Sequence, residues 1–131
     1  QATRCGIRWG QWGLYLHVEP VGWVAAEGID SETWTSALNL GLGADYLFAD
    51  GYIKTSLTAG PSVMLKGTKI DQPGDTGFFI DIRPAGFRWS LFEELIIGLE
   101  PLALSITAPA LGGIPLVEFA YRTNVSIEYL F

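Results

Sequence analysis

The C-terminal part of the chain alternates apolar and polar residues one by one from residue 115 to residue 131. A period of two is the period of a β-strand, in which successive side chains point to opposite faces. The segment therefore predicts a strand with one apolar, aromatic face and one polar, charged face. The odd positions carry Pro115, Val117, Phe119, Tyr121, Thr123, Val125, Ile127, Tyr129 and Phe131, and the even positions carry Leu116, Glu118, Ala120, Arg122, Asn124, Ser126, Glu128 and Leu130.

The same pattern runs from Trp34 to Phe48. One face of this segment is apolar, with aromatic residues at both ends and leucines between them, and the other face is mostly small or polar. Aromatic residues that flank an aliphatic band are typical of strands that cross a membrane in a β-barrel. This segment therefore favours a membrane-spanning strand.

Alternation marks six long segments, and 131 residues are enough for a single domain. The segments cover residues 7–26, 33–48, 52–66, 77–89, 95–107 and 114–131, and residues 1–6 are expected to be an N-terminal extension. Short turns at 49–51 and 90–94 alternate with longer loops at 28–32, 67–76 and 108–113. Consecutive strands joined in this way predict an all-β, antiparallel up-and-down fold.

The number of strands stays open. Single-chain barrels of the outer-membrane type have at least about eight strands, which favours eight for this chain. The long first segment would then hide a turn, for which residues 19–22 are the candidate position. A barrel shared between chains and a closed six-stranded barrel are the other two possibilities.

Five prolines complicate a closed sheet. Proline lacks the backbone N–H that a strand donates to its neighbour, so it is confined to bulges, strand ends and edge strands. Bulges near the rims of a barrel and edge strands of an open sheet are both consistent with the sequence. The residues concerned are Pro20, Pro61, Pro84, Pro101 and Pro115.

The polar faces of these segments carry charges of both signs at mid-strand. Buried charges persist in proteins when they are paired, so we expect an ion-pair network inside a narrow barrel. A solvated outer face of a soluble barrel is the alternative, because alternation alone does not tell which face points outward. The expected network consists of His17, Glu19, Lys54, Asp81, Arg83, Glu100, Glu118, Arg122 and Glu128.

The final strand carries the most specific signature. Val125, Ile127 and Tyr129 occupy alternate positions before a terminal aromatic residue, Phe131. In this feature the chain resembles the small outer-membrane β-barrel proteins of Gram-negative bacteria, whose last strand ends in an aromatic residue. The resemblance implies an antiparallel up-and-down transmembrane β-barrel located in the bacterial outer membrane. It also implies that the barrel-assembly machinery recognises Val125, Ile127, Tyr129 and Phe131, and that outer-membrane lipid surrounds the barrel.

Further expectations follow from this membrane interpretation. A signal peptide is expected to have been removed, because the sequence begins at Gln1 without an initiator methionine. The role would be structural or interactive, with assembly into homo-oligomers possible, or a narrow porin-like passage for solutes. The aromatic residues expected at the membrane interfaces are Trp12, Trp34, Tyr46, Phe48, Phe119 and Tyr121.

Two other functions are weighed against this one. In a soluble, secreted barrel like the lipocalins, Trp34, Leu38, Leu40 and Leu42 would line a cavity for a small apolar ligand. In a lipid-modifying barrel enzyme, His17 would act as a base, but no nucleophile motif accompanies it, so no enzymatic activity is expected.

Cofactors, metals and nucleic acid are not expected as ligands. No pair of cysteines or histidines has the spacing of a metal site, and the single cysteine, Cys5, permits no internal disulfide. The formal net charge of −6 disfavours nucleic acid, which binds basic surfaces.

Overall fold

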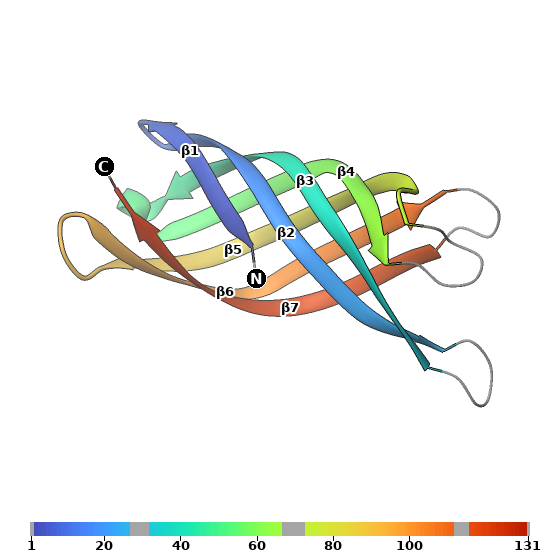
Figure 1. Cartoon of the computed structure of the whole chain (residues 1–131). Coiled ribbons are helices and arrows are strands. Elements are labelled where there is room, and N and C mark those ends of the chain that lie inside the picture. The colour runs from blue at the N-terminus through green and yellow to red at the C-terminus, as the bar shows by residue number, and fades with distance from the viewer. Residues whose placement is uncertain (1, 27–31, 67–72, 112–115, 131) are drawn as a thin grey trace.

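The computed structural model describes residues 2–26, 32–66, 73–111 and 116–130. In these residues the chain forms one antiparallel sheet of seven strands, and each strand pairs with the next one in sequence (Figure 1). The strands are β1 (Thr3–Trp9), β2 (Trp12–Ala26), β3 (Glu32–Phe48), β4 (Ile53–Lys66), β5 (Thr76–Ser90), β6 (Leu95–Ala110) and β7 (Leu116–Tyr129). A single 3-10 turn, Ala49–Gly51, joins β3 to β4. The all-β, antiparallel, up-and-down prediction is confirmed.

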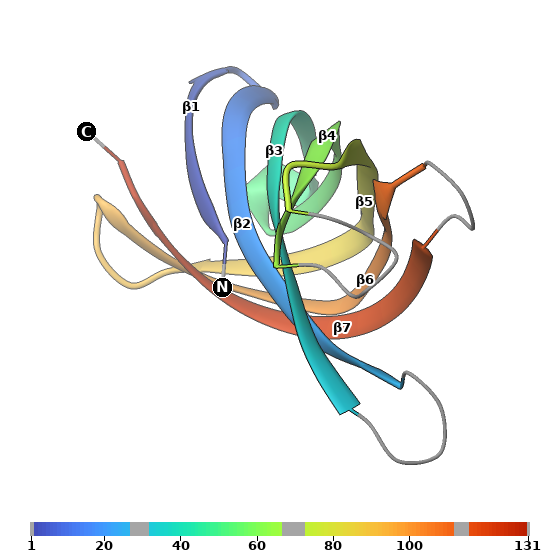
Figure 2. The ribbon, with the colours of Figure 1, turned by 45° about the vertical axis from the view of Figure 1, so that its right-hand side comes forward.

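The sheet curls into a deep trough but is not closed. Figures 1 and 2 show β1 and β7 brought round toward each other on one side of the molecule. Within the described residues, however, β1 pairs only with β2 and β7 pairs only with β6. The sheet therefore has two free edges, a concave face and a convex face. We call the gap between β1 and β7 the seam.

In the described residues the structure has seven strands where the sequence analysis marked six segments. The difference arises because the turn that divides the first segment was predicted at the wrong position. Trp9 pairs with Trp12, so the turn between β1 and β2 consists of Gly10 and Gln11. Gly10 has a φ of 58°, a left-handed value that glycine adopts without steric cost. Residues 19–22, the predicted turn, lie inside β2, and residues 3–6, the predicted extension, belong to β1.

Two of the five prolines lie at β-bulges. The pairing of β5 with β6 changes register between Ile82 and Ala85, and the pairing of β6 with β7 changes register between Glu100 and Ala103. Pro84 and Pro101 fall in these two intervals. A bulge tolerates the missing N–H of proline, so the bulge interpretation holds for both residues.

The remaining prolines have other settings. Pro20 lies in the part of β2 that extends beyond β1, whose pairing ends at Val18, so it fits the edge-strand interpretation. Pro61 pairs with Phe78 without a change of register. Pro115 lies outside the described residues.

The two faces of the sheet have opposite chemistry. The concave face buries polar side chains such as His17, Asn39 and Glu100, each with an exposed fraction of 1% or less. The convex face leaves large apolar side chains in the open, including Leu42 and Ile127. This arrangement is the reverse of a soluble barrel, which turns its apolar side chains inward. The face that contains Leu40 and Leu42 therefore does not line a cavity inside the trough. Trp34 belongs to β3, but its side chain lies outside the described part of the structure.

Two aromatic side chains fill the concave face by packing over glycines. The ring of Phe79 lies over Gly41, where an added Cβ would sit 2.6 Å from its Cζ atom. The ring of Tyr15 lies over Gly43 in the same way, and its hydroxyl is 2.8 Å from that of Thr58. The small residues of β3 therefore provide room for large side chains from β2 and β5.

Candidate functional site

The concave face carries a network of ion pairs whose centre is Glu100 on β6. Arg83 on β5 binds both Asp81, at 2.7 Å, and Glu100. Lys54 on β4 places its Nζ atom 3.3 Å from Glu100, and Arg4 on β1 reaches Asp81 at 3.4 Å. Four strands thus contribute to one cluster. All of these residues except Arg4 were predicted for the network from alternation.

A second cluster joins β4, β5 and β7 toward the turns that connect β3 to β4 and β5 to β6. Glu128 accepts a hydrogen bond of 2.5 Å from Lys54 and one of 2.7 Å from Arg88. Arg88 was missed by the sequence analysis. The bulge at Pro84 shifts the inward-facing positions of β5 from odd to even numbers, so Arg88 is buried together with Arg83. The sequence carried two signals for this shift: the proline, and the change of the apolar residues from even positions (Ile80, Ile82) to an odd one (Phe87).

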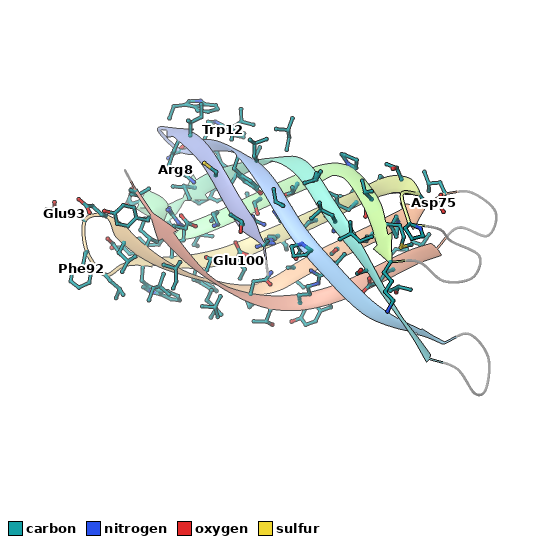
Figure 3. All side chains as sticks on the ribbon, in the orientation of Figure 1. Arg8, Trp12, Asp75, Phe92, Glu93 and Glu100 are labelled. Atoms are coloured by element: carbon teal, nitrogen blue, oxygen red, sulfur yellow. The ribbon has the colours of Figure 1, made fainter. Side chains whose placement is uncertain are left out.

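A third contact lies at the same end, between Arg8 on β1 and Asp45 on β3, 2.7 Å apart. Figure 3 shows Arg8 near the β1–β2 turn and Glu100 near the middle of the sheet. Neither Arg8 nor Asp45 was among the predicted network residues. The sequence did contain a signal for Asp45, because this residue lies on the polar face of its segment together with Gly41 and Gly43.

His17 and Glu19 on β2 form the fourth cluster. The Nε2 atom of His17 is 3.6 Å from a carboxylate oxygen of Glu19, and Glu19 accepts a 2.8 Å hydrogen bond from Arg122 on β7. The other ring nitrogen, Nδ1, accepts a hydrogen bond of 3.3 Å from Arg4, and the ring stacks on Phe79. Within the described residues none of the hydrogen bonds of His17 involves a serine. This environment holds the ring of His17 by packing on Phe79 and by the hydrogen bond from Arg4.

The network is close to electrically balanced. Six of the eight lysines and arginines take part in it, together with five carboxylates. Glu118 lies on the same face of β7 as Arg122, but it makes no ion pair within the residues that the structure describes. The six cations are Arg4, Arg8, Lys54, Arg83, Arg88 and Arg122, and the five carboxylates are Glu19, Asp45, Asp81, Glu100 and Glu128.

The predicted interface aromatics lie on the convex face where their side chains are described. Trp12, Tyr46 and Phe48 form a row at the end of the short turns, with ring centroids 4.7 and 4.6 Å apart. Figure 3 shows Trp12 at this end. Phe119 and Tyr121 lie in the first half of β7 and are highly exposed. The sequence analysis missed further exposed aromatic residues at the short-turn end, namely Trp9, Tyr52, Phe87, Trp89 and Phe92.

The residues of the expected assembly signal lie on the edge strand β7. Val125, Ile127 and Tyr129 all expose more than half of their surface on the convex face. Phe131 lies outside the described residues. The three described members therefore form an apolar stripe beside the seam.

Neither a metal site nor a membrane-spanning helix is found in the described residues. No group of three or more histidine, cysteine or acidic residues that could hold a metal ion occurs in the described part of the chain. No helix within the same residues is long and apolar enough to cross a membrane. In comparisons with models of protein families, with curated proteins and with solved structures, the chain has no significant match.

Proposed function

We propose that this chain forms an outer-membrane β-barrel whose interior is filled by ion pairs and whose role is structural or interactive. The observation that carries the proposal is that polar side chains are buried on the concave face while apolar side chains are exposed on the convex face. Soluble monomers rarely expose contiguous apolar patches larger than a few hundred Å². Here exposed apolar side chains cover the convex face of all seven described strands, from Ile7 on β1 to Ile127 on β7. Hydrocarbon is the medium in which such a face is stable.

Strand length supports the same conclusion. A tilted strand needs about 9–11 residues to cross the hydrocarbon core of a bilayer. The strands from β2 to β7 have 14 to 17 residues each. Each of them is therefore long enough to cross and to extend into the interface on both sides.

The positions of the outward-facing charges also fit a membrane. In the described residues, charged side chains outside the network and Glu118 occur at turns and at the ends of strands, and none lies mid-strand on the convex face. A charge facing lipid at the midplane costs about 2–4 kcal/mol for arginine or lysine. Confinement of charges to the ends is the distribution expected of an apolar band. The residues with described side chains are Asp50, Lys66, Asp75, Glu93 and Glu94.

The connections suggest which end faces the periplasm. The β1–β2, β3–β4 and β5–β6 connections are short and lie at one end of the sheet, together with the aromatic row of Trp12, Tyr46 and Phe48. Outer-membrane barrels have short turns on the periplasmic side and longer loops outside. The short-turn end, where β7 also finishes, is therefore assigned to the periplasm.

The network itself has a neutralising role in this proposal. Arg83, Glu100 and Lys54 meet in the middle of the trough, and over the whole concave face six cations face five carboxylates. Burial of charges is tolerated because they are paired, and their side chains occupy the space that a water-filled channel would need. Any solute passage would be narrow.

The test is localisation and folding in a Gram-negative host. The protein, expressed with a signal peptide, should fractionate with the outer membrane and should migrate differently on detergent gels before and after heating. Phe131→Ala should reduce assembly, since we expect the machinery to read the end of β7. Glu93→Ala, which changes an exposed residue in the β5–β6 connection, is the matched control and should assemble normally. Recovery of the protein from the periplasm as a stable species without detergent would contradict the proposal.

A further inference from the structure

The first and last strands of the sheet each leave one backbone edge without a partner. In the part of the chain that the structure describes, β1 pairs only with β2, and β7 pairs only with β6. Water satisfies the N–H and C=O groups of a free edge, but hydrocarbon does not, so open sheet edges do not occur where lipid surrounds them. In the proposed membrane location, both edges therefore need a partner.

The two edges run in the same direction and already approach each other at one point. Each described strand is antiparallel to the next, so β1 and β7, six steps apart, are parallel to each other. Figures 1 and 2 both show the beginning of β1 beside β7, and the two strands farther apart toward the short-turn end. Parallel strands pair through a ladder of evenly spaced hydrogen bonds. Closure of the seam therefore requires an approach mainly at the short-turn end.

An ion pair across the seam indicates the level at which β7 lies relative to β1. Arg122 on β7 donates a hydrogen bond of 2.8 Å to Glu19 on β2. Glu19 directly follows Val18, whose partner Thr3 begins β1. Arg122 thus lies level with the start of β1. The part of β7 beyond Arg122, Thr123–Tyr129, has the same length as β1, which has seven residues.

In this register the two edges present matching faces. On the convex side Ile7 lies beside Ile127, and these side chains belong to residues that are 71% and 74% exposed. On the concave side Arg8 lies beside Glu128. These two side chains are 26% and 23% exposed, and they are the ion-pair members nearest the wide part of the seam. Side-by-side pairs of opposite charge stabilise a sheet.

Other registers fit the side chains less well. A shift by one residue would set the inward-facing side chains of one edge beside the outward-facing side chains of the other. A shift by two residues in one direction would set Arg4 beside Arg122, which are like charges. The same shift in the other direction would set Arg8 beside Leu130, beyond the end of β7. The charges therefore favour the register in which Arg8 meets Glu128.

A second copy of the chain is the competing partner for the two edges. β7 of one copy beside β1 of another would also form a parallel pair, and repetition of this contact would build a ring or an open row of copies. The curl of the single sheet favours closure within one chain. It already brings the beginning of β1 to β7 and joins Arg122 to Glu19.

We propose that β7 pairs directly with β1 in the membrane and closes the seven described strands into a barrel with one parallel pair. An up-and-down sheet with an odd number of strands always closes through such a pair. Thr123–Tyr129 lie beside Thr3–Trp9, and Arg8 meets Glu128 on the inner side. The closed seam separates the ion pairs from lipid, so neither lipid headgroups nor solutes enter from the side. The inference rests on the proposed membrane location.

The first test asks whether predicted neighbours across the seam become joined. Cys5 is exposed on β1, and Val125→Cys places a second thiol beside it on the convex side of β7. Neighbouring strands lie about 4.8 Å apart, and a disulfide joins Cα atoms about 4.4–6.8 Å apart. Mild oxidation in outer membranes should therefore form this disulfide within one chain. Mass spectrometry of the joined peptides from the monomer band would identify it.

Two control variants set the scale for this yield. Leu16 is the direct partner of Cys5 in the β1–β2 ladder and is exposed, so Leu16→Cys gives the yield for adjacent strands. Val117→Cys makes the same substitution at an exposed position near the other end of β7 and should give no disulfide. A yield for Val125→Cys no higher than for Val117→Cys would overturn the proposal. A cross-linked dimer in place of the monomer would overturn closure within one chain.

The second test asks whether Arg8 and Glu128 meet, and it changes no residue of the expected assembly signal. In the open sheet Arg8 contacts Asp45, whereas Glu128 contacts Lys54 and Arg88, so Arg8→Met and Glu128→Gln should act independently. In the closed barrel the double variant should change the unfolding equilibrium constant less than the product of the single effects, by at least about twofold. Urea titration in vesicles measures all three variants. Independent effects would overturn the proposed register and closure.

Membrane fractionation separates this inference from the proposed function. Protein that fractionates with the outer membrane but fails either test retains the proposed function and overturns the closure. Protein that does not reach the outer membrane overturns the proposed function, and the closure that rests on it falls as well.

Discussion

Arginines paired with carboxylates occur both in the middle of the sheet and at its edges, but they differ in how deeply they are buried. In the middle, Arg83 contacts two carboxylates and is almost completely buried. At the edge, Arg122 contacts one carboxylate, Glu19, and leaves nearly a third of its side chain exposed. The free energy of an ion pair depends on how far its partners are withdrawn from water, so two similar pairs should differ strongly in what their loss costs.

The largest effect is expected where the comparison is sharpest, at Arg83. Arg83→Met removes the cation but keeps much of the volume, and it leaves Asp81 and Glu100 close together and less well paired. Loss of one partner from a buried pair costs about 3–5 kcal/mol. The free energy of unfolding, measured in lipid vesicles by urea titration with tryptophan fluorescence, should fall by that order. A change of less than about 1 kcal/mol would show that water reaches the middle as freely as the seam.

A charge on the convex face should come next. Leu42→Arg places a cation near the middle of β3, on a side chain that is largely exposed. If lipid covers this face, the free energy of unfolding in vesicles should fall by about 2–4 kcal/mol. Glu93→Arg, in the exposed β5–β6 connection, is the control and should have little effect. Equal stability of the two variants would contradict a lipid-facing surface at Leu42.

A smaller loss is expected from overpacking in the middle of the sheet. Gly41→Val adds side-chain atoms where Phe79 already lies, so the ring must move. Overpacking of this kind typically costs about 1–3 kcal/mol. The same substitution with Phe79→Ala should recover part of the loss, which a double-mutant cycle on urea unfolding would measure. Purely additive effects would mean that the ring does not occupy this space.

The smallest effect is expected at the seam. Arg122→Met removes one partially exposed pair with Glu19. Exposed pairs contribute about 0.2–1 kcal/mol, so unfolding should change by no more than that. A loss as large as that of Arg83→Met would show that Arg122 is as well shielded from water as Arg83. The difference between the two variants therefore measures how much more freely water reaches the edge of the sheet than its middle.

The sequence was sufficient to predict most of the sheet because alternation is directly tied to the geometry of a strand. It placed Glu100, Lys54 and Glu128 on one face, and the structure brings them together. It did not decide whether that face points inward, because soluble and membrane barrels both alternate. The burial of His17 and Glu100 beside the exposure of Leu42 supplies that information.

The failures have a common physical origin in positions where alternation is interrupted. The two-residue turn at Gly10 is too short to leave a loop signature, so β1 was merged with β2. Arg88 was missed because a bulge changes which positions face inward. Long-range pairs such as Arg122 with Glu19 depend on how far the sheet curls, and a local pattern does not encode that curvature.

The bulges at Pro84 and Pro101 determine which of the following positions face inward, much as a reading frame determines how the following codons are read. Each inserts one residue, on neighbouring strands, and the β5–β6 register is restored beyond them. Deletion of Pro84 alone would act as a frameshift. It would turn Arg88 toward the convex face and Phe87 toward the carboxylates, although no residue beyond Pro84 would have changed. Small insertions and deletions in these two strands are therefore tolerated only in combinations that preserve the frame, so residue counts here are constrained as strongly as residue types.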